Sequence, residues 1–196
     1  DLVRSRGLGD VYKRQAQRII VMGYHKPDIN HPDSAVYDAI GSLLSQGRSS
    51  RLYRALVRDK KVATMAYGVT GFPGRKYPGM FLFYAFTALG HTNDEVEKAI
   101  DAETERLKSE LVSAEELDGV KRRARANLLR QLDSNLMLAI QLSRFQAVTG
   151  DWRNLFRERE RINAVTPQDI QRVAKATFIW NNKTVGTIDP IGAASK

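Results

Sequence analysis

Zinc chemistry requires particular side chains at particular spacings, and this chain does not have them. Its histidines, His25, His31 and His91, never lie three or four residues apart, so no helix face can present two imidazole rings to one zinc ion. Neither His-Glu-x-x-His nor His-x-x-Glu-His occurs. Each histidine lies beside a turn or a proline, which favours a solvated or structural role in a loop. The sequence predicts no metal ion and no cofactor bound by this chain.

Patterns for nucleophilic catalysis and phosphate binding are also missing from the sequence. Ser49 and Ser50 lie just after Gly47, but the Gly-x-Ser-x-Gly elbow that exposes a nucleophilic serine does not occur. The chain has no cysteine, which excludes disulfides, thiolate nucleophiles and iron–sulfur clusters. The loop at Gly47 lacks the Lys-Ser/Thr pair of a phosphate-binding loop. We therefore predict no catalytic residues in this chain.

The chain is strongly basic, with 31 Lys and Arg against 22 Asp and Glu and a formal charge of +9. Such a surplus fits an anionic partner such as nucleic acid, whose binding would weaken steeply with salt. Tyr53 is the one aromatic residue within the basic clusters, and Glu115, Glu116 and Asp118 lie at ion-pair spacing from the second, which favours solvated helix faces. We therefore expect no nucleic-acid partner. The two clusters are Arg48, Arg51, Arg54, Arg58, Lys60 and Lys61, and Lys121, Arg122, Arg123 and Arg125.

The length of 196 residues, with 42% hydrophobic and 27% charged residues, is typical of one globular domain with a sizeable core. No window reaches the roughly 18 consecutive apolar residues of a membrane helix, so we expect no membrane span. Residues 1–15 resemble the translated read-through of a sequencing adapter, and we expect a non-native or disordered leader that contributes part of the charge. The domain is expected over residues 16–190, followed by a frayed tail over 191–196.

The first half of the chain predicts a strand, two helices and two strands. A β-branched run opens it, Asp33 is placed to cap a helix, and Gly47 is placed to stop that helix. The fifth of these elements is apolar on both faces, which predicts a central strand. The expected elements are a strand over 17–24, a helix from Asp33 to Gly47, a short helix ending near Asp59 to Lys61, and strands over 62–70 and 80–89.

The second half predicts helices followed by one strand. Thr92 with Glu95, and Ser113 with Glu116, form the sequence pattern of a capping box. The second box is expected to open one long helix that reaches Gly150, with a possible irregularity over 133–135 and an inward face running from Leu117 through Leu136 to Ile140. A charged helix after Asp151, a helix opened by Thr166-Pro167 and a strand over 183–188 complete the chain.

The order of these elements does not alternate as in a doubly wound α/β chain. It instead predicts an α+β domain in which an antiparallel-type sheet is backed by helices.

The run LLSQGRSSRLYRALVRD, from Leu43 to Asp59, closely resembles the second-domain signature of the M16 metallopeptidases, the insulinase, pitrilysin and mitochondrial-processing-peptidase-like family. The short runs GYHKP, GHTN and GDW, which begin at Gly23, Gly90 and Gly150, are similar to the bacterial branch. The resemblance covers residues 17–189. It implies the LuxS/mitochondrial-processing-peptidase-like metallohydrolase fold.

In the family that this chain resembles, homologous domains pair as a clamshell around a chamber for unfolded peptides, and only one domain carries the His-x-x-Glu-His zinc site. The resemblance therefore implies a non-catalytic C-terminal-type domain that encloses and positions a peptide substrate. Zinc is expected in a partner M16 catalytic domain, either upstream on the same polypeptide or on a separate subunit.

The resemblance also implies residues that contact the substrate. The loop before the Ser-Arg-Leu-Tyr run faces the chamber in several members of the family, and an Arg followed seven residues later by a Tyr holds the peptide. Arg58 matches that Arg, whereas Met65 lies at the Tyr spacing and Tyr67 is displaced by two. The residues themselves favour Tyr67 as a strand residue in the core or at its edge over a contact with substrate. The candidate substrate-contact residues are Gly47, Arg48, Ser49, Ser50, Arg58 and Tyr67.

Two other functions stay open from the sequence. The lost zinc motif permits an assembly or scaffold subunit derived from the family, and the basic clusters permit nucleic-acid binding. The compartment is undetermined, with the periplasm favoured over the cytoplasm.

Overall fold

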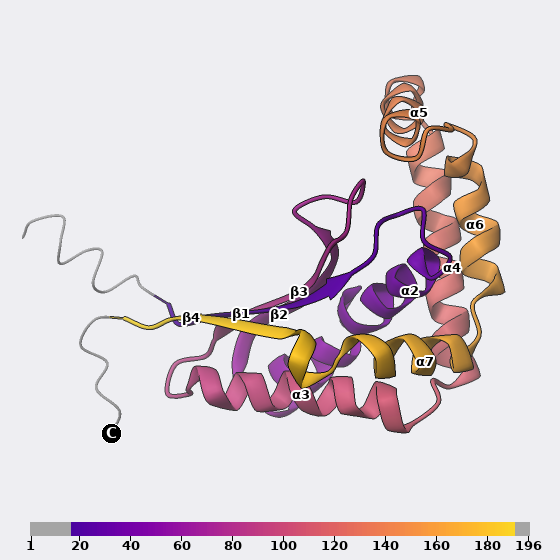
Figure 1. Ribbon diagram of the computed structural model, residues 1–196. Helices are drawn as coiled ribbons and strands as arrows, with labels where there is room; N and C mark the ends of the chain where they lie inside the picture. Colours follow the sequence, from indigo (N-terminus) through magenta and orange to yellow (C-terminus); the bar gives the residue numbers. More distant parts are fainter. Residues whose placement is uncertain (1–16, 191–196) are drawn as a thin grey trace, which may run out of the picture.

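The computed structural model describes residues 17–190, which form a four-stranded antiparallel sheet with helices on one face (Figure 1). The expected leader and tail lie outside these residues. The spatial order is β2-β3-β1-β4, so β3 is interior as predicted, and β2 and β4 are the edges. The predicted α+β class is confirmed. The strands are β1 (Ile19–Lys26), β2 (Ala63–Phe72), β3 (Gly79–Thr87) and β4 (Lys183–Ile188).

The helices lie in two stretches of the chain, between β1 and β2 and between β3 and β4. No helix among the described residues is both long and apolar enough to cross a membrane. The helices are α2 (Ser34–Ser45), the π-helix η1 (Tyr53–Asp59), α3 (Asn93–Ser109), α4 (Ala114–Leu132), α5 (Asn135–Thr149), α6 (Asn154–Ala164), α7 (Pro167–Thr177) and the short 3-10 helix η2 (Trp180–Asn182).

Helix capping follows the sequence in part. Ser113 and Glu116 form the predicted reciprocal capping box at the start of α4. At α3 only half of the predicted box exists, because the Glu95 carboxylate binds His91 Nδ1 at 2.6 Å. Asp33 occupies the N-cap position of α2, but its side chain makes no cap hydrogen bond. Instead, the Arg172 guanidinium donates a hydrogen bond to each oxygen of the Asp33 carboxylate, at 2.6 and 3.0 Å.

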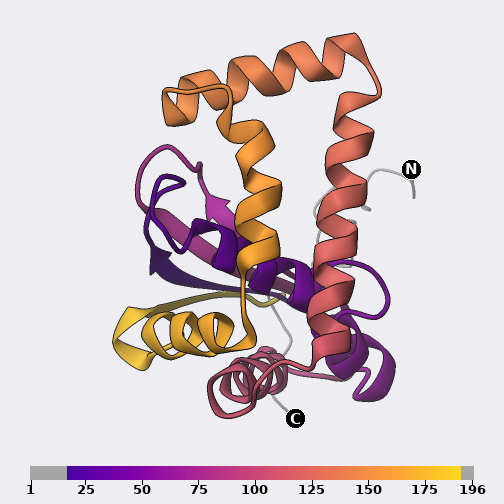
Figure 2. The ribbon, with the colours of Figure 1, turned by 90° about the vertical axis from the view of Figure 1, so that its right-hand side faces the viewer.

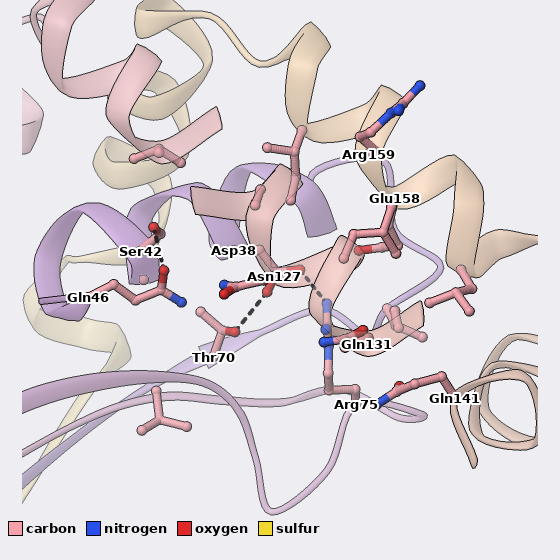
Figure 3. A pocket seen from close by; sticks show the side chains of 18 of the residues that line it. Asp38, Ser42, Gln46, Thr70, Arg75, Asn127, Gln131, Gln141, Glu158 and Arg159 are labelled. Carbon is pink, nitrogen blue, oxygen red and sulfur yellow. Dashed lines mark hydrogen bonds and ion pairs between the residues drawn. The ribbon is translucent and has the colours of Figure 1, made fainter. Parts of the chain in front are cut away.

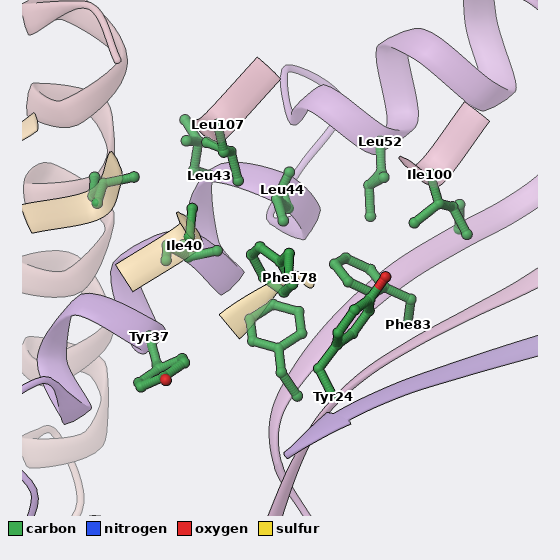
Figure 4. Close-up of a cluster of buried hydrophobic side chains, with 14 of the residues drawn as sticks. Tyr24, Tyr37, Ile40, Leu43, Leu44, Leu52, Phe83, Ile100, Leu107 and Phe178 are labelled. Carbon is green, nitrogen blue, oxygen red and sulfur yellow. The ribbon is translucent and has the colours of Figure 1, made fainter. Parts of the chain in front are cut away.

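The main core lies between the sheet and the helices (Figure 4). Phe178, which follows α7, is at its centre. Its ring lies 5.1 Å from the Tyr24 ring, 5.4 Å from Phe81 and 5.7 Å from Phe83, with the first two contacts edge to face. Aromatic pairs of this geometry stabilise beyond the area they bury. The residue that follows α7 is thereby joined in one cluster with strands β1 and β3.

The opposite face of the sheet is apolar and uncovered. Alternate residues of β3 that point away from the core, including Leu82, Tyr84 and Phe86, are only half-buried. On β2, Tyr67 and Val69 are about 40% exposed. No helix among residues 17–190 packs on this side (Figure 1). The apolar character of β3 on both faces therefore reflects one buried face and one open face.

The prediction of a single long helix is wrong, because the helix is interrupted at Asp133. Ser134 adopts an extended conformation and its hydroxyl accepts the Met137 N–H, which starts a new helix. Figure 2 shows the result: α4 rises out of the domain, α5 crosses over, and α6 returns. We call α5 together with the adjoining ends of α4 and α6 the arm. Leu136 and Ile140, expected to point inward, are 70% and 48% exposed because they lie on the arm.

The arm has a small core of its own. Phe145 of α5 and Leu155 of α6 are buried together with Ile29, which lies in the loop after β1. Partly buried leucines of α4 and α5 pack around these three side chains. The loop after β1 is thus the point at which the central part of the fold meets the arm.

Candidate functional site

A cavity of about 490 Å³ lies where the arm meets the sheet, between α2, β2, α4, α5 and α6 (Figure 3). Its walls combine apolar side chains with a small number of charged and amide groups, as ligand-binding cavities commonly do. The apolar lining includes Ile29, Val69, Val120, Leu128, Phe145, Val148, Leu155 and Ile162, and the polar lining includes Asp38, Gln46, Thr70, Arg75, Asn127, Gln131, Gln141 and Glu158.

Asp38 organises one wall of the cavity. Arg75, from the loop between β2 and β3, donates to Asp38 Oδ2 at 2.6 Å, and the Thr70 hydroxyl donates to Asp38 Oδ1 at 2.8 Å. These charge-assisted contacts join α2 to the β2–β3 hairpin. Both carboxylate oxygens of Asp38 are engaged, so this group supports the wall.

Glu158, the other carboxyl group of the cavity lining, takes no part in the hydrogen bonds around Asp38. Its side chain is 15% exposed, and its Oε1 atom lies 3.6 Å from Arg161 Nη1 but accepts no hydrogen bond from the described residues. Burial raises the pKa of Glu158, and the neighbouring Asp38 charge raises it further, while Arg75 and Arg161 act in the opposite direction. A raised pKa extends to higher pH the range in which this carboxyl group is protonated and can donate a hydrogen bond.

Close packing of α2 on β2 forms the inner end of the cavity. A Cβ atom on Gly41 would lie 2.8 Å from Thr70 Cγ2, closer than real side chains approach. The Ser45 hydroxyl accepts the Gly68 N–H at 2.5 Å. These contacts position the β2 residues that line the cavity.

Tyr67 lies on the exposed edge strand at the border of this cavity. Its ring stacks on Tyr84 of β3, with centroids 5.6 Å apart and planes inclined by 22°. The side chain therefore belongs to the open face of the sheet and not to the main core. Tyr67 is a strand residue at an edge of the sheet, and its contact with a substrate stays a prediction.

Arg58 lies elsewhere, in a second hollow of about 250 Å³ that Tyr67 does not line. The exposed guanidinium of Arg58 binds the adjacent Asp59 carboxylate at 2.7 Å. The structure therefore places the two candidate residues in different hollows. The second hollow is lined by Arg51, Arg54, Ala55, Arg58, Asp59, Glu103 and Arg106.

The loop from Gly47 to Ser50 lines neither hollow. Gly47 has a φ of +82°, which glycine adopts without strain, and Arg48 and Ser49 are exposed. Ser50 is buried, and its hydroxyl has no hydrogen-bond partner among the described residues. Only Arg48 and Ser49 of this loop present side chains to a partner.

Zinc does not fit the described part of the chain. Residues 17–190 contain no group of three or more His, Cys, Asp or Glu side chains that could hold a metal ion. His91 is engaged with Glu95, and His31 Nδ1 accepts the Asp33 N–H at 3.1 Å. His25 lies on strand β1 and is exposed, so the three histidines do not meet at one place.

The sequence did not indicate the 490 Å³ cavity. Its lining comes from α2, β2, a hairpin loop and three later helices, and no local spacing predicts that these meet. Glu158 lies in the charged run RERER, which is typical of a solvated helix face. A local sign is Gly41, a glycine in the interior of the helix expected from Asp33 to Gly47.

An antiparallel sheet covered by helices on one face defines an α+β domain. The family described as "Peptidase M16 inactive domain" matches residues 5–124. The chain belongs to this family.

Individual relatives agree with that assignment. The "Zinc protease PqqE" of Helicobacter pylori is 27% identical over 171 residues, covering 87% of this chain and 38% of the relative. The crystal structure of a protease from Helicobacter pylori matches with a TM-score of 0.82 at 27% identity, over 89% of this chain and 41% of that one. The chain thus spans about two fifths of these relatives.

A third relative matches the domain alone. The inactive peptidase domain of a putative zinc protease from Bordetella parapertussis has a TM-score of 0.80 at 29% identity, covering 91% of this chain and 95% of that chain. The predicted M16 inactive-domain fold is confirmed.

Proposed function

We propose that this chain is the non-catalytic half of a zinc-dependent M16-type peptidase, which encloses and positions a peptide for a partner domain that holds the zinc ion. The partner lies on the same polypeptide or on another subunit. The chain's own residues take no part in activating water.

The observation that carries this proposal is the open apolar face of the sheet. Exposed contiguous apolar surface is uncommon on a free domain and indicates contact with another molecule. Here Tyr67, Val69 and Tyr84 offer aromatic and branched side chains to a peptide. The edge strand β2 adds backbone N–H and C=O groups that no neighbouring strand of the described sheet uses on that side.

The family membership supports the same function. Two relatives that this chain resembles are described as a zinc protease and as a protease, and each is more than twice as long as the matched region. The described residues do not fit zinc. The zinc-bearing part of the enzyme is accordingly proposed to lie outside them.

The experiment is reconstitution. The purified chain is mixed with the zinc-bearing M16 domain of the same organism, and hydrolysis of a library of fluorogenic peptides is measured. We expect no hydrolysis by this chain alone and a rate in the mixture well above that of the zinc-bearing domain alone. Equal rates with and without this chain would contradict the proposal and favour a scaffold subunit.

A further inference from the structure

Four arginines converge on the hollow of about 250 Å³ between η1 and α3, which we call the arginine hollow. Arg51 precedes η1, Arg54 and Arg58 lie on it, and Arg106 lies in the last turn of α3. Asp59 and Glu103 are the carboxylates in its lining. Four arginines and two carboxylates therefore line the hollow, while Glu116 and Glu110 contact Arg51 and Arg106 from beside it.

Arg51 is fixed at the inner end of the hollow. Its side chain is 3% exposed, and Glu116 accepts from Nε at 2.9 Å and from Nη2 at 2.8 Å. The remaining nitrogen, Nη1, is buried and has no partner among the described residues. A buried donor without a partner is costly, and the cost is larger for a charged group. The bidentate contact holds the guanidinium in one orientation, so the unused donor is preorganised.

The outer arginines are held loosely. Arg54 approaches Glu116 at 3.7 Å, which is too long for a hydrogen bond. Arg106 contacts Glu103 and Glu110 at 3.4 Å each. Their guanidinium groups keep donors available to a ligand, whereas Arg58 is taken by Asp59 at 2.7 Å.

The backbone around the hollow is unusual as well. η1 is a π-helix, in which the Lys60 N–H binds the Ala55 carbonyl at 3.1 Å, and Lys61 has a φ of +55°. Both conformations are rare and cluster at functional sites. The π-helix η1 carries Arg54 and Arg58, which line the same hollow as Arg106 of α3.

We propose that the arginine hollow binds one oxyanion group, a carboxylate or a phosphate, between Arg51, Arg54 and Arg106. Guanidinium forks match the planar oxygens of these anions. The hollow is small, and no aromatic residue is among the described residues that line it, which argues against a nucleic-acid track. The proposal does not depend on assembly with a zinc-bearing domain.

The test uses the chain alone and calorimetric titration at low salt. The probes are inorganic phosphate, an acetylated alanine-rich pentapeptide with a free C-terminal carboxylate, and the same peptide amidated. Binding of phosphate, or of the free but not the amidated peptide, supports the proposal and identifies the source of the oxyanion. No binding of phosphate and no difference between the two peptides would overturn it.

Variants locate the binding. Arg54→Gln and Arg106→Gln are expected to weaken the responsive probe by about tenfold each, since each removes a charge-assisted hydrogen bond. Arg125→Gln makes the same charge change on an exposed part of α4 outside the hollow and is expected to leave affinity within twofold. Nuclear magnetic resonance of the unmodified chain provides a second measurement, in which the arginine side-chain signals of the hollow should shift on titration. Equal effects of all three variants, or shifts elsewhere, would overturn the assignment.

Discussion

Arg51 and Glu116, 65 positions apart in the sequence, form a bidentate ion pair with contacts of 2.8 and 2.9 Å. Glu116 also completes the capping box of α4 with Ser113, so one carboxylate holds the start of a helix and a buried arginine. The M16 signature run is thereby attached to the base of the helix that carries the arm.

Loss of this carboxylate should destabilise the fold. In Glu116→Gln, Arg51 keeps its buried charge but loses its ionic partner, and we expect the free energy of unfolding to fall by about 2 kcal/mol. Arg51 lowers the pKa of Glu116, so the stabilisation is present above the ordinary value of 4.5 and is lost as pH falls through the lowered value. Urea unfolding at a series of pH values measures both effects. An unchanged midpoint at pH 7 would show that the pair contributes nothing.

Two helical glycines should respond to alanine with opposite signs. Gly41→Ala would press a methyl group against Thr70 at the inner end of the cavity, and we expect a loss of about 1–2 kcal/mol despite the better helix propensity of alanine. Gly119→Ala on α4 meets Arg123 Nη1 only at 3.4 Å, so propensity should dominate and stabilise by up to about 1 kcal/mol. Thermal unfolding of both variants checks the pair. Stabilisation by Gly41→Ala would contradict the close approach of α2 to β2.

Glu158 should make stability decrease with rising pH. Its pKa is raised by burial and by Asp38, so above the ordinary value of 4.5 the folded chain holds a proton that the unfolded chain releases. Stability attributable to this group therefore falls as pH rises from 4.5 through the raised value. Glu158→Gln is expected to remove that slope and to be more stable than the parent chain at pH 7.

The control for this prediction is Glu160→Gln, an exposed position on the same helix. Its pH profile of unfolding should follow that of the parent chain. Parallel profiles for all three proteins would contradict the role assigned to burial at Glu158.

In the reconstituted peptidase, Tyr67→Ala should lower kcat/KM for peptides and leave the zinc content unchanged, because it removes part of the open sheet face. Tyr77→Ala is the matched control, since Tyr77 is 71% exposed on the β2–β3 loop and does not belong to a strand. Arg58→Gln tests the second candidate residue in the same assay. Equal kinetics for parent and Tyr67→Ala would remove Tyr67 from the substrate surface, and equal kinetics for Arg58→Gln would remove Arg58.

Local sequence patterns were sufficient for most elements of the fold. The strand over 183–188 and the helix opened by Thr166-Pro167 were predicted because hydrophobic period and capping residues act within a few positions. The break between α4 and α5 was placed correctly as an irregularity over 133–135, but its consequence was not predicted. Apolar residues at helical spacing through Ile140 predict a buried helix face, but they do not say which element covers that face. On the arm, most of that face is left exposed by the described residues.

Ion pairs between residues far apart in the chain could not be predicted from the sequence. Glu116 was expected to pair within its own helix, yet it pairs with Arg51. Asp33 was expected to cap α2, yet Arg172, 139 positions away, binds it with two hydrogen bonds. In both cases a bidentate contact with a distant guanidinium replaces a local contact. Only the tertiary fold determines which arginine binds each carboxylate. The cavity at Glu158 escaped prediction for the same reason.

The separate small core of Phe145, Leu155 and Ile29 has a consequence for hydrogen exchange. A segment held by few buried side chains opens at a lower free energy than the global unfolding of its domain. Amide protons of α5 should therefore exchange faster than those of α7 under native conditions, through an opening that leaves the sheet folded. The arm would then behave as a separate cooperative unit, able to reshape the mouth of the 490 Å³ cavity while the rest of the domain stays intact.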